Sequence, residues 1–274
     1  MSIPLHRHSR RNSRPGWRLL PGAAILLACA LAAAAQPVRL IAHRGGVVDA
    51  GRPENSVAAL EEAVRRGYWM VEMDIQESKD GRLVVHHDSF QKDFSDPRWP
   101  RDMTWAEIQR LRAKADGSGV LSFEQYAPLA RNRIRLMIDV KGPDHPRAFY
   151  QALEKVLRDN GLLDSVYMIS DRPEPRAYFK GKLPVAATRD ELLRAGSAGE
   201  NVPRIYFLFE HGTTLDAAGI ELAKRLGVPA VVSINEFHYR GRDHWQAAHA
   251  DIDRLKALGL VYFQIDSPYD QWLR

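Results

Sequence analysis

Short apolar runs alternate with longer amphipathic segments from residue 38 to the end of the chain. An apolar run of about four to eight residues bounded by polar or turn-forming residues predicts a buried strand. Apolar side chains that recur every three or four positions predict a helix with one buried face. The strands predicted in this way cover residues 38–42, 69–75, 83–87, 134–140, 166–169, 183–187, 205–209, 230–234 and 262–265.

Helical segments lie between most of these strands. The run at 83–87 is set aside as an excursion, because a turn-forming stretch joins it directly to the strand before it. The remaining eight strands alternate with helices, which predicts an α/β fold of the (β/α)8 TIM-barrel type. In such a barrel the functional side chains gather at the carboxyl ends of the strands. The predicted helices cover residues 57–66, 105–112, 147–160, 189–195, 214–226 and 245–258.

The second strand and the excursion after it form a predicted β-hairpin over residues 68–88. Glu72 and Asp74 alternate with apolar residues, so both carboxylates lie on one face of the strand. A turn centred in the Ser-Lys-Asp-Gly sequence sets Glu72 opposite His87 and Asp74 opposite Val85. The hairpin therefore returns His87 to the level of the two carboxylates. A solvated amphipathic hairpin is the alternative.

The segment 89–120 follows the hairpin and holds one predicted short helix among many polar or turn-prone residues. It is long for a simple connection between two elements. We therefore predict a loop or a small subdomain over the mouth of the barrel, and a disordered insertion is the alternative.

Charged residues also end the first and the third barrel strands. His43 and Arg44 follow the first strand, and the two glycines after them let another group approach the backbone. Asp139 and Lys141 share one face at the end of the third strand. A structural His-Arg pair and a buried Asp-Lys ion pair are the alternatives to a functional role.

Three acids, Glu72, Asp74 and Asp139, thus gather at one end of the predicted barrel. Carboxylate oxygens are hard ligands, which favour Mg²⁺ or Ca²⁺ over zinc. Arg44 and Lys141 add positive charge that suits a phosphate diester. The sequence therefore predicts a divalent cation as cofactor and a small-molecule phosphodiester as substrate.

At these strand ends the chain resembles the glycerophosphodiester phosphodiesterases. That family has the pattern HRG, PEN followed by Ser or Thr, Glu-x-Asp, DG, a strand ending in HD, and an acid two residues before a lysine. Order and spacing match over about residues 38–141, whereas the C-terminal half is supported mainly by a closing Asp-x-Pro. The corresponding residues are His43-Arg44-Gly45, Pro53-Glu54-Asn55-Ser56, Glu72-Met73-Asp74, Asp80-Gly81, His87-Asp88 and Asp139-Val140-Lys141, with Ser122-Phe123-Glu124 and Asp266-Ser267-Pro268 further along.

The resemblance implies a TIM barrel that hydrolyses glycerophosphodiesters to glycerol 3-phosphate and an alcohol, in phospholipid and glycerol metabolism. It implies a divalent cation, Ca²⁺ or Mg²⁺, on the three acids. His43 and His87 would be the acid-base pair, and Arg44 and Lys141 would bind the phosphate. Two alternatives remain: a lysophospholipase D-like enzyme acting on lysophospholipids, and a non-catalytic binding protein on the same barrel.

Some positions near the expected site need separate comment. Glu54 is expected to orient Arg44 or His43, unless it only stabilises the start of a helix through the helix dipole. His86 is expected to face away from the site. The chain departs from the family in having Asp139 where many members have Glu, in having Val232 where they commonly have tryptophan, and in lacking a threonine-rich stretch after the HD pair.

The net charge of +5 arises in the N-terminal segment. Residues 1–35 contain five arginines and no acidic residue, so the rest of the chain carries as many basic as acidic residues. Charge therefore gives no reason to expect a nucleic-acid partner or an anionic membrane partner.

The same segment has the form of a secretory signal peptide: a basic start, an apolar run over residues 23–35, and small residues suited to cleavage. We predict a signal peptide over 1–35 and a TIM-barrel domain over 36–274. The apolar run is too short for a comfortable membrane span, so we expect no stable span in the mature chain and a periplasmic or secreted location. Cys29, the only cysteine, is the candidate acylation site if the protein is a lipoprotein.

Overall fold

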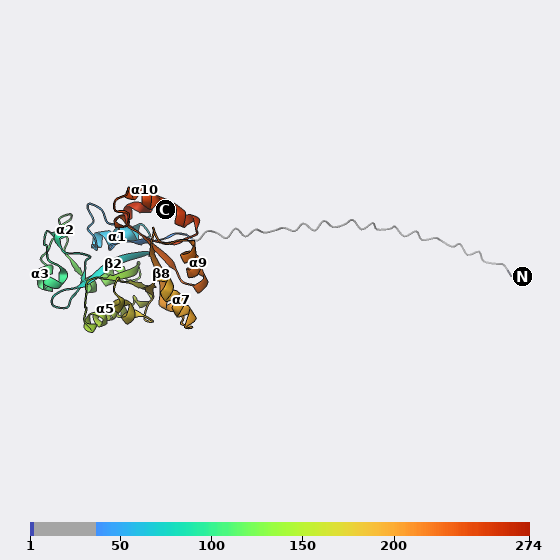
Figure 1. Cartoon of the computed structure of the whole chain (residues 1–274), viewed down its shortest axis with the longest axis horizontal. Coiled ribbons are helices and arrows are strands. Elements are labelled where there is room, and N and C mark those ends of the chain that lie inside the picture. The colour runs from blue at the N-terminus through green and yellow to red at the C-terminus, as the bar shows by residue number, and fades with distance from the viewer. Residues whose placement is uncertain (3–36) are drawn as a thin grey trace. The chain divides into compact units, whose positions relative to one another are not determined.

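Eight parallel strands close into a barrel within residues 37–274, which with Met1 and Ser2 are the residues described by the computed structural model (Figure 1). Strand β1 pairs with both β2 and β10, and these two pairings close the sheet. The predicted (β/α)8 barrel is therefore confirmed. Most of the predicted signal peptide, Cys29 included, lies outside the described residues. The barrel strands are β1 (Arg39–Ala42), β2 (Met70–Glu77), β5 (Arg135–Val140), β6 (Val166–Ile169), β7 (Val185–Ala187), β8 (Tyr206–His211), β9 (Ala230–Ile234) and β10 (Tyr262–Ile265).

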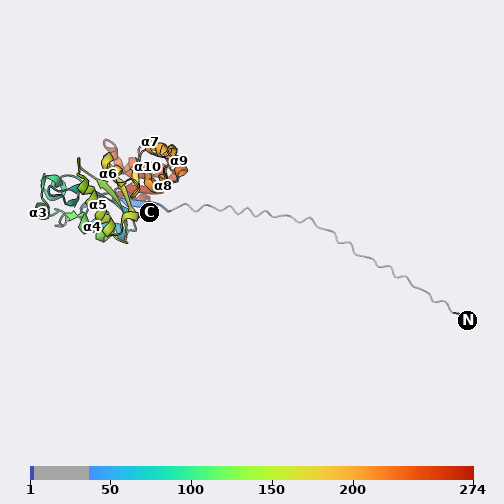
Figure 2. The same cartoon turned by 90° about the horizontal axis from the view of Figure 1, so that it is seen from below.

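Helices follow most of the barrel strands and surround the sheet (Figures 1 and 2). None of those in the described part of the chain is both long and apolar enough to cross a membrane. Outside the segment 89–120, the α-helices are α1 (Val57–Arg65), α4 (Phe123–Ala130), α5 (Arg147–Asp159), α6 (Pro173–Phe179), α7 (Arg189–Ser197), α8 (Val202–Ile205), α9 (Ala217–Leu226) and α10 (His244–Ala257), and the 3₁₀ helices are η2 (Leu163–Ser165), η3 (Glu236–Tyr239) and η4 (Ser267–Trp272).

Helices α4, α6 and α8 are absent from the sequence prediction, and proline accounts for this only in α4, where it lies inside the helix. Pro128 lies inside α4, while α6 and α8 have proline in their first turn. Proline disfavours a helix interior but is well tolerated at a helix start. In α4 the Gln125 side chain accepts a hydrogen bond from the Ser122 amide, and this contact fixes the first turn.

The apolar side chains form two layers separated by the sheet. One cluster comes from barrel strands alone, so it fills the barrel interior; its fully buried members include Ile41, Met70, Met137 and Phe207. A larger cluster combines the outward-facing strand residues with the inner faces of the helices. Because side chains alternate along a strand, residues two positions beyond the interior set must also face inward. The same alternation directs the candidate site residues at the strand ends into the barrel.

The hairpin and the segment 89–120 form one structured excursion. Strand β3 (Leu83–Val85) runs antiparallel to β2, and β4 (Leu121–Ser122) runs antiparallel to β3. Between them lie α2 (Gln91–Phe94), η1 (Pro100–Asp102) and α3 (Trp105–Ile108).

These short elements pack Phe90, Met103 and Ile108 against Val84 in a small core of their own. The segment is thus an ordered small subdomain, and the alternative of a disordered insertion is wrong. The helix predicted at 105–112 is shorter than expected and ends at Ile108.

The predicted register of the hairpin is wrong by one residue. Val85 pairs with Ile75 rather than with Asp74, and the His86 amide donates to the Asp74 carbonyl oxygen. The cause is the turn, in which the Ser78 amide bonds to the Arg82 carbonyl. The turn is therefore centred on Asp80 and not on the bond before it.

Candidate active site

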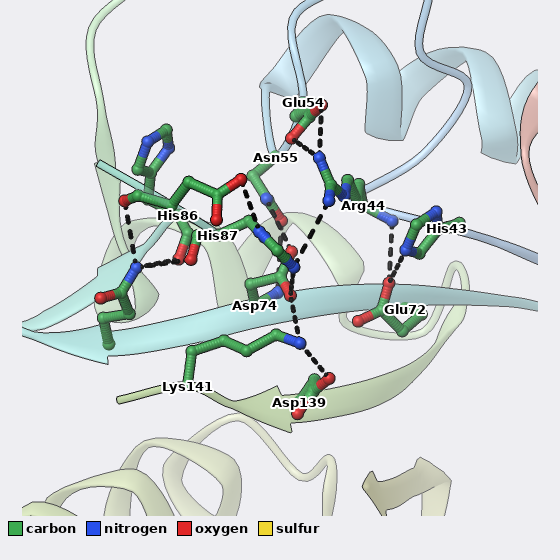
Figure 3. Close-up of polar contacts among 12 residues, drawn as sticks. His43, Arg44, Glu54, Asn55, Glu72, Asp74, His86, His87, Asp139 and Lys141 are labelled. Carbon is green, nitrogen blue, oxygen red and sulfur yellow. Dashed lines mark hydrogen bonds and ion pairs between the residues drawn. The ribbon is translucent and has the colours of Figure 1, made fainter. Parts of the chain in front are cut away.

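Three carboxylates meet inside the mouth of the barrel (Figure 3). Glu72 and Asp74 follow Met70 at alternate positions of β2, so they continue its inward-facing row. Asp139 of β5 is the direct register partner of Asp74. One oxygen from each carboxylate lies within 4.8 Å of those of the other two, and all three residues are buried.

Burial and the charge of Asp74 raise the pKa values of Glu72 and Asp139. Burial together with the charge of Asp74 raises the pKa of Glu72 to about 8. Burial also raises the pKa of Asp139, even though the neighbouring Lys141 acts in the opposite direction. Ionising all three acids in this site therefore requires additional positive charge.

The same acids fit a hard divalent cation. Asp74 Oδ1 and Asp139 Oδ1 are buried and accept no hydrogen bond from any described group. Lys141 Nζ lies 2.7 Å from Asp139 Oδ2 and 3.9 Å from Asp74 Oδ1, which neutralises only part of the charge. Crowded carboxylate oxygens with free lone pairs are the ligand type that Mg²⁺ and Ca²⁺ prefer.

His43 lies beside the acids on the inward-facing side of the end of β1. Its Nδ1 is 2.6 Å from Asp266 Oδ1, and its Nε2 is 3.9 Å from Glu72 Oε2. Burial alone would lower the pKa of His43, but the neighbouring carboxyl groups, above all the hydrogen-bonded Asp266, outweigh this effect and raise the pKa. His43 is therefore held in a form that can donate a proton from Nε2.

His87 reaches the acids from the other side of Asp74 (Figure 3). Its Nε2 lies 4.0 Å from Asp74 Oδ1 and accepts a hydrogen bond from Arg44 Nη2 at 3.4 Å. An arginine can only donate, so Nε2 of His87 is the acceptor in this contact. The Gln76 side-chain amide lies within 3.3 Å of three consecutive carbonyl oxygens, those of residues 86 to 88, and holds this segment in place.

His86 faces away from the site, as expected (Figure 3). Its ring stacks on Phe90 with centroids 4.6 Å apart, and its Nε2 contacts the Ser89 carbonyl oxygen. It belongs to the core of the small subdomain.

Arg44 is fixed by Glu54, which confirms the orienting contact expected for that residue. Both carboxylate oxygens of Glu54 lie 2.8 Å from Arg44 Nη1. Lys92, from α2 of the small subdomain, forms an ion pair with the same carboxylate. The ion pairs of Glu54 with Lys92 and Arg44 thus connect the small subdomain to the site.

The two glycines after Arg44 allow a close backbone approach, as predicted. A Cβ on Gly45 would lie 2.4 Å from the Asn55 Cα, and one on Gly46 would lie 2.1 Å from the Ala59 carbonyl oxygen. Asn55 is thereby brought to Asp74, to which its side-chain amide donates at 3.1 Å.

Two contributors to the site escaped the sequence analysis. Asp266, read there only as part of a closing Asp-x-Pro, holds His43 and in turn accepts hydrogen bonds from the Asn235 side chain and the Glu236 amide. Asn55, named there only as part of the Pro53–Ser56 motif, donates to Asp74. The inward parity of the last strands could have indicated Asp266, since it directly follows β10.

Val232 stands where the family commonly has tryptophan, but its side chain does not face the site. It packs in the core between the sheet and the helices. The apolar surface beside His43 comes instead from Phe237 of η3, whose ring centroid lies 6.1 Å from that of His43. A tryptophan at position 232 is therefore not needed to provide this surface.

The fold and the site together define a (β/α)8-barrel protein with a candidate cation centre flanked by two histidines. The sequence pattern of the glycerophosphoryl diester phosphodiesterase family matches residues 43–234, and the chain belongs to that family.

Individual relatives match over shorter stretches. The chain is 32% identical to human glycerophosphodiester phosphodiesterase 1 over 129 residues, which cover 43% of this chain and 38% of that protein. The chain spans less than half the length of the curated relatives that head the comparison.

Solved structures of the family share the fold. A glycerophosphodiester phosphodiesterase from Agrobacterium tumefaciens superposes with a TM-score of 0.65 at 23% identity, covering 84% of this chain and 97% of that one. A phosphodiesterase from Oleispira antarctica, solved in complex with the product sn-glycerol-3-phosphate, has a TM-score of 0.66 at 18% identity and covers 84% of this chain and 93% of that one.

Proposed function

We propose that this protein is a cation-dependent phosphodiesterase that hydrolyses glycerophosphodiesters to glycerol 3-phosphate and an alcohol. The observation that carries the proposal is the placement of His43 and His87 on either side of one buried acidic cluster, at the barrel mouth of a chain that belongs to this family. The product bound to the Oleispira antarctica protein supports glycerol 3-phosphate as the product here.

Glu72, Asp74 and Asp139 would hold the cation, either Mg²⁺ or Ca²⁺. When bound, the cation supplies positive charge to a phosphoryl oxygen. Arg44 and Lys141 would bind the other phosphate oxygens. Arg44 suits this role because Glu54 fixes its guanidinium, which leaves little side-chain freedom to be lost on binding.

The histidines differ in the way that an acid-base pair requires. His87 would use its Nε2 lone pair to take the proton of the attacking hydroxyl, from water or from the neighbouring hydroxyl of the glycerol. That oxygen bonds to phosphorus, and the bond from phosphorus to the alcohol oxygen breaks. His43 would donate its Nε2 proton to the departing oxygen. After attack by the glycerol hydroxyl, water would open the cyclic phosphate to the same product.

The decisive experiment measures glycerol 3-phosphate released from glycerophosphocholine and glycerophosphoglycerol by the purified chain. We expect release that stops in EDTA and returns when Mg²⁺ or Ca²⁺ is restored. The exposed His249, on the surface of α10, offers a control, since His249→Ala should keep full activity. A folded, cation-loaded protein that releases nothing from either diester would overturn the proposal.

We infer in addition that the protein is exported, on the basis of residues 1–35. The basic start, the apolar run and the small residues before position 36 support a signal peptide. N-terminal sequencing of protein recovered from the periplasm or the medium should give a chain that starts near Gln36, or at Cys29 if that residue is acylated. An uncleaved chain in the cytoplasm would refute export.

A further inference from the structure

A cavity of about 630 Å³ opens beside His43 and extends away from the acidic cluster. Its walls come from η3, the loop that follows it and the start of α10, together with Arg44, Glu54 and Asp266. Neither His87 nor any of the three acids lines it. The cavity therefore lies on the His43 side, where the proposed mechanism places the departing alcohol.

The size of the cavity exceeds what a three-carbon glycerol needs. Clefts of about 300–1,000 Å³ hold ligands of drug-like size. The alcohol portion of a glycerophosphodiester is the part whose size varies, so it is the better match for this space.

Two guanidinium groups of the cavity wall have no ion-pair partner in the described part of the chain. Arg44 and Lys92 are paired with Glu54, and Asp266 is held by His43. Arg240 and Arg242 form no ion pair with any residue between 37 and 274, and both are exposed.

The one remaining acid of the wall is Glu236, so the charge left over is positive. A guanidinium forms two parallel hydrogen bonds to a phosphate or carboxylate group. An anionic ligand would be bound by Arg240 and Arg242 and opposed by Glu236.

Two aromatic side chains stand open at the same wall. Phe237 is 45% exposed and Trp245 is 42% exposed, although large apolar side chains are usually covered. Trp245 is supported from below by the buried Tyr269, at 5.6 Å between ring centroids and 90° between planes. Such faces can stack on a ring-shaped polyol, and alone they would also suit a quaternary ammonium group. The two adjacent guanidinium groups disfavour the cation.

We propose that this cavity, the headgroup pocket, selects diesters whose alcohol part carries a second anionic group. The inference rests on the proposed function, because it assigns the pocket to the alcohol of the same substrate. Arg240 and Arg242 bind the anionic group, and Phe237 and Trp245 contact the body of the alcohol.

The test compares two ligands that differ by one phosphate, glycerophosphoinositol 4-phosphate and glycerophosphoinositol, with glycerophosphocholine as a cationic third. Binding is measured by calorimetry with the His87→Ala protein in the presence of Mg²⁺, and turnover is measured with the wild type. We expect the phosphorylated ligand to bind at least about tenfold more tightly than its partner. We expect its kcat/KM to exceed that of the partner by a similar factor.

Variants of the wall separate local recognition from general charge. In Arg240→Gln/Arg242→Gln the ratio of the two affinities should fall by about 10- to 100-fold, to near one. Glu236→Gln, at the same wall but of opposite sign, should raise the ratio. Arg194→Gln/Arg204→Gln removes the same charge from the exposed surfaces of α7 and α8 and should leave the ratio unchanged.

Equal affinity for the two inositol ligands would overturn the inference while leaving the phosphodiesterase activity intact. A preference for glycerophosphocholine, or an equal loss in the α7 and α8 variant, would overturn it as well. If no diester is hydrolysed but the phosphorylated ligand still binds through Arg240 and Arg242, the proposed function fails and the anion-binding pocket stands.

Discussion

The two histidines of the site approach one acidic cluster but are held in opposite ways. His43 is nearly buried and forms a short hydrogen bond to Asp266, which keeps its pKa raised. His87 is more exposed, and its closest acidic neighbour, Asp88, is itself 52% exposed. The Nε2 of His87 accepts a hydrogen bond from Arg44. The asymmetry indicates that protein surroundings, rather than the residue type, make one imidazole a donor and the other an acceptor.

The largest expected effect is the loss of turnover on replacing either histidine, and its dependence on the leaving group should differ between the two variants. His43→Ala and His87→Ala should each lower kcat/KM for an alkyl glycerophosphodiester by about 10²- to 10⁴-fold. A nitrophenolate leaves without being protonated, so a p-nitrophenyl glycerophosphodiester should largely restore turnover to His43→Ala and not to His87→Ala. Nitrophenolate absorbance gives the rates directly. Equal rescue of both variants would contradict the assignment.

A second prediction concerns the acidic cluster that both histidines face. In the cation-free protein the raised pKa of Glu72, about 8, keeps that carboxyl protonated at neutral pH. A cation must displace this proton, so the affinity for the cation should rise about tenfold per pH unit between roughly pH 6 and pH 8. Calorimetry in buffers of different ionisation enthalpy should detect about one proton released. A Kd that does not change with pH would refute this account of the cluster.

The smallest expected effect concerns the carboxylates beside the two histidines, Asp266 beside His43 and Asp88 beside His87. Asp266→Asn removes the group that raises the pKa of His43, so the activity lost on deprotonation of His43 should be lost at lower pH. The alkaline limb of the kcat/KM profile should move to lower pH, with roughly tenfold lower activity at its optimum. Asp88→Asn should leave the alkaline limb in place and change the activity at the optimum by no more than about threefold, because that exposed carboxylate is screened by solvent. Similar shifts in both variants would remove the asymmetry.

Much of the barrel could be predicted because its strands are buried on both faces. Such strands appear as apolar runs whatever their neighbours are, and β6, β9 and β10 have the predicted bounds. Alternation along β2 and β5 was enough to bring Glu72, Asp74 and Asp139 to one place. Local periodicity therefore predicts the part of the site that strands alone position.

The rest depends on contacts that no local pattern contains. Asp266 holds a histidine 223 positions away, and only closure of the barrel brings the two together. The headgroup pocket is formed by a short 3₁₀ helix and a loop, whose conformation has no periodic signal. The hairpin register depends on a turn centred on Asp80, where a difference of half a residue changes every cross-strand pair.

The ion pairs of Glu54 with Lys92 and Arg44 join the small subdomain to the barrel. These two regions differ in how freely their sequences can vary. The small subdomain has its own core and lies outside the barrel strands, so its sequence and length can change without opening the sheet. A change that moves Lys92 would still reach Arg44, because both pair with Glu54. If Arg44 binds phosphate as proposed, a change in the small subdomain alters that binding without any change to the residues at the strand ends.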